Sequence, residues 1–123
     1  MRAVVFSMVL AFTLAVGVSF AGDAGKGKDV FNGAGKCKTC HKTDSDALKT
    51  PVGPGLAGVT KSYDDAFLTE WLKDPQGTWT KGGKNIEAIQ KKVSKVGKPK
   101  TAMAPGKISD AEIADVIAYL HTL

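Results

Sequence analysis

Residues 37–41 read Cys37-Lys38-Thr39-Cys40-His41, and the interpretation of the whole chain starts from this stretch. It uses both cysteines of the 123-residue chain and one of its two histidines. C-x-x-C-H is the pattern of covalent haem attachment. Residues three and four apart on a helical turn share a face, so both thiols can reach one porphyrin while His41 coordinates its iron from the same side. The motif therefore predicts one haem c (iron) per chain, bound through Cys37 and Cys40.

Two other uses of the cysteine pair fit the surrounding sequence less well. A thioredoxin-like dithiol expects alternating strands and helices around the pair, and residues 37–41 have no such surroundings. A zinc site needs four ligands, but the second histidine, His121, lies far away near the C-terminus. We therefore expect haem attachment, with dithiol chemistry as the alternative.

The N-terminal segment has the composition of a secretory leader. Arg2 is followed by no charged residue until Asp23, and the apolar run ends in Ser-Phe-Ala at positions 19–21. Small residues spaced in this way favour signal-peptidase cleavage directly after them. We expect residues 1–21 to be a cleaved signal peptide and residues 22–123 to form one domain in the periplasm. An uncleaved membrane anchor is the alternative, because the run approaches the lower length limit of a membrane span.

The chain is basic, with a formal net charge of +5, and the excess is unevenly distributed. Eight lysines lie between Lys81 and Lys107 against the single acid Glu87, whereas three acids lie between positions 110 and 115. Such asymmetry can orient a small protein toward a partner of opposite charge, although any single lysine can equally serve solubility. Nucleic-acid binding is not expected, because no motif for it occurs and the chain is expected to be exported.

Helical periodicity and capping signals predict an all-α domain of four to five helices, with no run of strand-like alternation. Ser62 and Asp65 form an S-x-x-D capping pair, and Ser109 with Glu112 forms a capping box. The stretch from position 77 to 83 is expected to be a loop. The helices are expected after Asp23, from Ser62 to Asp74, over 86–96 and from Asp110 to near the end.

The order of these elements resembles a class I monohaem cytochrome c, a small exported c-type cytochrome. An N-terminal helix leads to C-x-x-C-H, and Gly-Pro-x-Leu follows at 53–56. A Met-Ala-Pro loop lies at 103–105, and the final helix holds Tyr-Leu at 119–120. The resemblance covers nearly all of the expected mature chain, and it implies a cytochrome c-like fold wrapped around one haem.

The resemblance also implies the iron ligands. It assigns His41 to the proximal position and Met103 to the distal position, and it implies that the Pro54 carbonyl accepts a hydrogen bond from the second nitrogen of His41. Met103 has independent support, because the other two methionines lie in the expected leader. The alternative for Met103 is a side chain that fills a gap in the core. The alternative for Pro54 is an ordinary Pro-Gly turn with no contact to His41.

Two further expectations concern aromatic residues. The resemblance implies that Gly27 and Phe31 of the first helix cross the last helix near residues 119–120. It also implies that an aromatic side chain reaches a haem propionate. Trp79, expected on a loop, is the better candidate, and core packing is expected for Trp71.

An iron held by an imidazole and a thioether has no open position for substrate, so the expected function is single-electron transfer and not enzyme catalysis. The attachment motif contains Lys38 and is flanked by Lys36 and Lys42. These lysines could meet an acidic docking surface on redox partner proteins. We expect a monomer that docks transiently and touches a membrane only if the leader is retained. The alternative is a haem subunit of a larger periplasmic oxidoreductase complex, for example in sulfur-compound oxidation, with the segment from Lys81 to Lys100 as a permanent interface.

Overall fold

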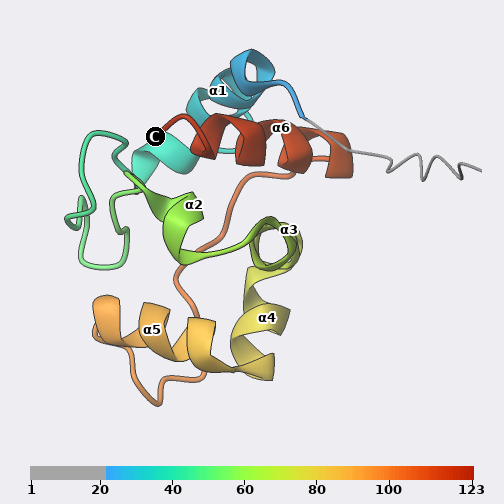
Figure 1. Cartoon of the computed structure of the whole chain (residues 1–123). Coiled ribbons are helices and arrows are strands. Elements are labelled where there is room, and N and C mark those ends of the chain that lie inside the picture. The colour runs from blue at the N-terminus through green and yellow to red at the C-terminus, as the bar shows by residue number, and fades with distance from the viewer. Residues whose placement is uncertain (1–21) are drawn as a thin grey trace, which may run out of the picture.

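The computed structural model describes residues 22–123, so the expected signal peptide at residues 1–21 lies outside the described residues. Figure 1 shows α1 and α6 packed side by side, with α3, α4 and α5 forming the other part of the domain. Within residues 22–123 the regular elements are all helical, which confirms the predicted fold class. The elements are α1 (Ala24–Asn32), the 3-10 helix η1 (Cys37–Thr39), α2 (Val59–Ser62), α3 (Asp65–Lys73), α4 (Pro75–Lys81), α5 (Lys84–Lys92) and α6 (Asp110–Leu120).

Helices α1 and α6 meet backbone to backbone. A Cβ atom on Gly27 would lie 1.9 Å from the carbonyl oxygen of Asp115, so only glycine allows this approach. Next to it, the rings of Phe31 and Tyr119 pack edge to face with centroids 5.4 Å apart. The expected crossing of the first and last helices is therefore present. The capping box of Ser109 begins α6 at Asp110, as predicted.

Helix α3 begins later than the sequence indicated. Its N-cap is Asp64, whose side chain accepts a hydrogen bond from the backbone N–H of Phe67. The expected pair of Ser62 and Asp65 is wrong, because Ser62 ends the separate short helix α2. As an N-cap, Asp64 provides the side-chain oxygen that was expected from Ser62, next to the backbone N–H groups of the first turn that have no partner within the helix.

The predicted loop at 77–83 is helical over most of its length. Pro75 is the first residue of α4, where its missing N–H is harmless. The Asp74 side chain accepts a hydrogen bond from the backbone N–H of Gly77 at 2.9 Å and caps the helix. The chain therefore turns at Asp74 and continues as a second helix that ends at Lys81.

Helix α5 is shorter than its apolar pattern predicted. Ile86 is buried and Ile89 packs against the core, but the helix ends at Lys92. Ser94 has φ of 55°, a left-handed conformation that turns the chain away from the helix axis. Val96, expected on the buried face, is 63% exposed.

The buried core joins all parts of the described domain. Among residues 22–123, no helix is both long and apolar enough to cross a membrane. The buried apolar residues are Phe31, Cys37, Leu68, Trp71, Leu72, Trp79, Ile86, Val93, Ile113, Val116, Ile117 and Leu120.

Candidate haem site

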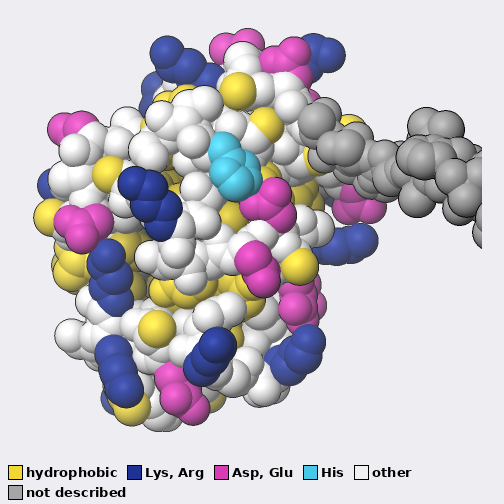
Figure 2. Space-filling view, in the orientation of Figure 1, with side chains coloured by type: hydrophobic (Ala, Val, Ile, Leu, Met, Phe, Trp, Pro, Cys, Tyr) yellow, Lys and Arg dark blue, Asp and Glu magenta, His cyan; other side chains and the backbone are white. Residues whose placement is uncertain are grey.

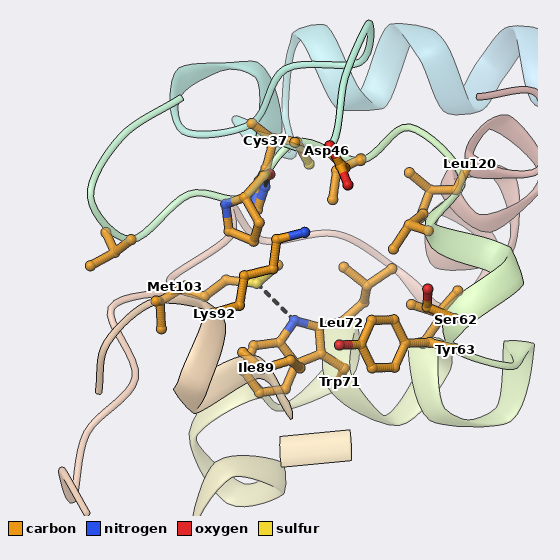
Figure 3. A pocket seen from close by; sticks show the side chains of 18 of the residues that line it. Cys37, Asp46, Ser62, Tyr63, Trp71, Leu72, Ile89, Lys92, Met103 and Leu120 are labelled. Atoms are coloured by element: carbon orange, nitrogen blue, oxygen red, sulfur yellow. Dashed lines mark hydrogen bonds between the residues drawn. The ribbon is translucent and has the colours of Figure 1, made fainter. Parts of the chain in front are cut away.

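A cavity of about 220 Å³ lies inside the domain, between the segment that follows η1, the helices α3 and α5, and the chain that leads into α6. Figure 3 shows Cys37 at one end of this cavity and Trp71 and Tyr63 at the other. Most of its wall is apolar, and α3 and α6 contribute Leu68, Leu72 and Val116. The space suits a flat apolar group that is held by a few polar contacts.

Four of the five predicted site residues line this cavity, and they come from segments far apart in the sequence. They are Cys37, His41, Pro54 and Met103. The fifth, Cys40, is exposed and is not part of the cavity wall.

The attachment motif folds as one tight turn. Lys36 has φ of 56° and starts the turn in a left-handed conformation. The backbone N–H groups of Cys40 and His41 both donate to the carbonyl oxygen of Cys37, at 3.2 and 3.0 Å. The turn therefore holds the two cysteines and the histidine in one local unit, with Cys37 buried and Cys40 exposed. Burial raises the pKa of the Cys37 thiol above its usual value.

His41 is held by the Gly-Pro segment. Its Nδ1 lies 2.6 Å from the carbonyl oxygen of Pro54. A carbonyl can only accept, so Nδ1 carries the proton and Nε2 keeps a lone pair for a metal. Burial lowers the pKa of the imidazole, and the hydrogen bond to Pro54 partly offsets this effect. The side chain is therefore kept in the neutral form that can bind iron.

The loop that carries Pro54 is folded tightly on itself. The backbone N–H of Leu56 donates to the carbonyl oxygen of Lys42 at 2.8 Å, and that of Gly55 donates to the carbonyl oxygen of Ala47 at 2.9 Å. A Cβ atom on Gly53 would lie 2.0 Å from the carbonyl oxygen of Cys40. The glycines therefore allow this loop to lie directly on the backbone of the attachment motif.

Met103 enters the cavity from the chain between α5 and α6. Its sulfur accepts a hydrogen bond from the indole N–H of Trp71, with Nε1 and Sδ 2.8 Å apart, as Figure 3 shows. Its backbone N–H donates to the hydroxyl of Thr101 at 3.1 Å. Side chain and backbone are thus both fixed, and the thioether lies in the same cavity as His41.

Helix α4 fixes the chain that leads to Met103. The indole N–H of Trp79 donates to the carbonyl oxygen of Lys98 at 2.9 Å. The side-chain amide of Gln76 donates to the carbonyl oxygen of Pro99 at 3.0 Å and accepts from the backbone N–H of Thr101 at 3.2 Å. Trp79 is buried in α4 and its N–H is already used, so its expected role at a propionate is not supported. The reason is that α4 is a helix where a loop was expected.

Among the residues of the cavity wall that sequence reasoning did not place there are Tyr63, Trp71, Lys92 and Lys95. Trp71 was expected only to pack in the core, yet its N–H reaches Met103. Burial raises the pKa of the Tyr63 hydroxyl above its usual value. The sequence did carry a signal for Trp71, because this aromatic residue lies one helical turn after Phe67 on the face of the helix that faces the core. Nothing in the sequence marked Lys92 among its neighbouring lysines.

These residues fit a covalently bound haem. The cavity offers a neutral imidazole with a free Nε2, a soft thioether sulfur and an apolar lining, and two thiols stand on the turn that carries the histidine. This donor set is that of a c-type haem with one histidine and one methionine ligand.

The comparisons with known proteins agree with this geometry. The family model described as "Cytochrome c" matches residues 24–123. A cytochrome c2 from Rhodospirillum rubrum is 36% identical over 115 residues, which cover 83% of this chain and 98% of that protein. A second cytochrome c2, from a named strain of the same species, is 33% identical over 126 residues, covering 92% of this chain and 90% of that protein. No solved structure matches the chain. The chain therefore belongs to the cytochrome c family as a class I monohaem electron carrier, with a covalently bound haem c whose attachment motif contains Cys37 and Cys40.

Proposed function

We propose that the protein carries single electrons on a haem whose iron is ligated by His41 and Met103. One observation carries this proposal: the Nδ1 of His41 is committed to the Pro54 carbonyl, and the sulfur of Met103 lies in the same cavity. The imidazole thus offers only Nε2 to a metal, and the thioether is the one soft sulfur in that cavity other than Cys37.

Bound haem supplies a one-electron couple whose potential depends on its axial ligands. The protein supplies the rest of the mechanism. His41 and Met103 would hold the iron between them and would leave it no open position for a substrate. A thioether ligand favours the ferrous state relative to a second histidine. Leu68 and Leu72 form part of the apolar wall of the cavity, which would limit the solvent rearrangement that accompanies a change of charge.

We infer a periplasmic location. The leader-like residues 1–21 support export, with the mature domain beginning at Gly22. The similarity to two cytochrome c2 proteins supports the assignment of this chain to the c-type cytochromes. Covalent haem attachment suits a protein that is matured after export.

The redox partners are expected to present acidic docking surfaces. Figure 2 shows hydrophobic side chains in a recess, with lysine side chains on both sides of it. Lys36 and Lys42 flank the attachment motif and Lys38 lies within it, and an acidic partner would be steered toward this region and bound briefly. The protein would act as a monomer.

The alternative role, a haem subunit of a larger complex, rests on the segment from Lys81 to Lys100. Ile86 and Val93 of this segment are buried in the protein's own core, and the carbonyl of Lys98 is held by Trp79. The segment is therefore needed within the chain itself, which favours the free carrier. Gel filtration of native material tests this point, because elution together with a fixed partner would favour the complex.

The ligand assignment is tested by Met103→Ala. The variant should keep its covalent haem but bind carbon monoxide readily in the ferrous state, because one axial position becomes free. Val96→Ala is a matched control, since Val96 lies on the same loop and is 63% exposed. If wild-type ferrous protein already binds carbon monoxide as fast as Met103→Ala, Met103 is not a ligand.

A further inference from the structure

Lys92 is placed at the cavity by the helix that precedes it. It is the last residue of α5, three residues after Ile89, and residues with this spacing share a face of a helix. Ile89 packs against the core and Val93 is buried, so the Lys92 stem starts beside the buried face. Figure 3 shows its side chain extending into the cavity toward the space between Cys37 and Trp71.

Lys95 reaches the same cavity by another route. The left-handed Ser94, with φ of 55°, reverses the chain at the end of α5. The backbone N–H of Lys95 then donates to the carbonyl oxygen of Gln90 at 2.8 Å, a bond that closes the helix end. Lys95 is half-buried as a result and lines the cavity together with Lys92.

Neither lysine has an ion-pair partner within residues 22–123. Lys92 is exposed and Lys95 is half-buried, so each can present its ammonium group at the rim of the apolar space, where a negative charge on a bound group would be favourable. The acidic side chain on the cavity wall is Asp46, which is exposed and belongs to the loop on the attachment side. Two cations therefore face a cavity whose wall offers one carboxylate, at its exposed side.

Haem c carries two propionate carboxylates, and they lie on the edge of the porphyrin away from the vinyl groups to which the cysteines bind. We propose that Lys92 and Lys95 form ion pairs with these propionates when haem is bound, which makes the end of α5 the anion-binding part of the haem site. This inference rests on the proposed function, because it needs the haem to occupy this cavity.

The pairing has a measurable consequence. An ammonium group within about 4–6 Å lowers the pKa of a carboxyl group by about 1–3 units. An ionised propionate stabilises ferric haem more than ferrous haem, because ferric iron carries one more positive charge. Protonation of the propionate therefore raises the reduction potential, and its ionisation appears as an inflection in the curve of reduction potential against pH. The other titratable groups on the cavity wall are Cys37, His41, Asp46 and Tyr63.

The test compares two double variants of equal net charge. Lys92→Gln with Lys95→Gln removes both cavity lysines, and Lys91→Gln with Lys98→Gln removes two exposed lysines of the same segment that do not line the cavity. The reduction potential of each haem-loaded protein is measured as a function of pH. The cavity variant should show the propionate inflection about 1–3 units higher than wild type, whereas the control should keep the wild-type inflection.

A second measurement needs no variant. In the NMR spectrum of the wild-type ferrous protein, the ε-methylene protons of Lys92 or Lys95 should show nuclear Overhauser contacts to the propionate methylene protons. Equal inflections in both double variants, or the absence of these contacts, would overturn the lysine assignment and leave the proposed function intact. A wild-type protein that lacks the spectrum of a His/Met haem would overturn the proposed function itself.

Discussion

The two sides of the haem cavity are built in different ways. The attachment side, residues 36–57, holds its ligand through backbone hydrogen bonds between near neighbours in the sequence, as between Leu56 and Lys42. The distal side holds Met103 and its loop through side chains from α3 and α4, in hydrogen bonds that join residues 25 and 32 positions apart. The first side depends on glycines and a proline that let backbone lie on backbone. The second depends on particular donors and acceptors that converge after folding.

The two sides are joined at one close contact. The backbone N–H of Gly106 donates to the carbonyl oxygen of Gly35 at 3.0 Å. A Cβ atom on Gly106 would lie 1.8 Å from the carbonyl oxygen of Ala34. The distal loop is thus anchored to the start of the attachment turn, and both sides together set the separation of His41 and Met103.

The largest effect is expected from Gly53→Ala on the attachment side. The new methyl group would meet the carbonyl oxygen of Cys40 at 2.0 Å, which rotation of a side chain cannot relieve. We expect the free energy of unfolding to fall by about 3 kcal/mol, measured by guanidinium denaturation of the haem-loaded protein. Gly25→Ala is the control, because Gly25 is exposed in α1 and its nearest neighbour is the end of the Asp23 side chain. Equal stability of the two variants would show that the loop has room that the structure denies.

A smaller effect is expected from Gln76→Ala on the distal side. This change removes the hydrogen bonds to the carbonyl oxygen of Pro99 and from the N–H of Thr101. These two hydrogen bonds, each with a net contribution of about 1 kcal/mol, hold the segment of chain that leads to Met103. We expect the ferric variant to bind cyanide several-fold faster than wild type. Gln90→Ala in α5 should leave the rate unchanged, and a similar rate in all three proteins would contradict the role given to α4.

The smallest effect is expected from Trp71→Phe, which keeps an aromatic ring but removes the N–H that donates to the Met103 sulfur. That hydrogen bond draws electron density from the thioether and so disfavours ferric iron. The reduction potential should fall, by at most about 40 mV, since a one-electron tenfold change is about 59 mV and the bond is worth about 1 kcal/mol. Tyr119→Phe is the control and should keep the wild-type potential, because Tyr119 packs against Phe31 of α1 and does not line the cavity. An unchanged or raised potential in Trp71→Phe would contradict the assigned contact.

This difference between the two sides explains what the sequence could predict. The attachment turn, the contact between Pro54 and His41, and the crossing of α1 and α6 at Gly27 are each set by a short motif or by one small residue. The capping box at Ser109 is also local. The attachment turn and the capping box can be recognised from a few neighbouring residues, because their constraints are local. The contact between Pro54 and His41 and the crossing at Gly27 were expected from the resemblance to the cytochrome c family.

The distal side could not be predicted in the same way. Asp74 is both the C-cap of α3 and the N-cap of α4, and the helical conformation of α4 depends on this double role. Pro75 alone did not indicate it. The contacts of Trp71 with Met103 and of Trp79 with Lys98 join residues 32 and 19 positions apart. No periodicity specifies which indole N–H meets which acceptor, so the roles of the two tryptophans could be settled only by the folded structure.

The ligation of iron by Met103 is tested most directly by the absorption spectrum of the wild-type ferric protein. A sulfur-to-iron charge-transfer band occurs when a methionine thioether is bound to ferric haem. We predict that the band is present at neutral pH and lost in Met103→Ala. A ferric wild-type protein with covalent haem but without this band would contradict the account.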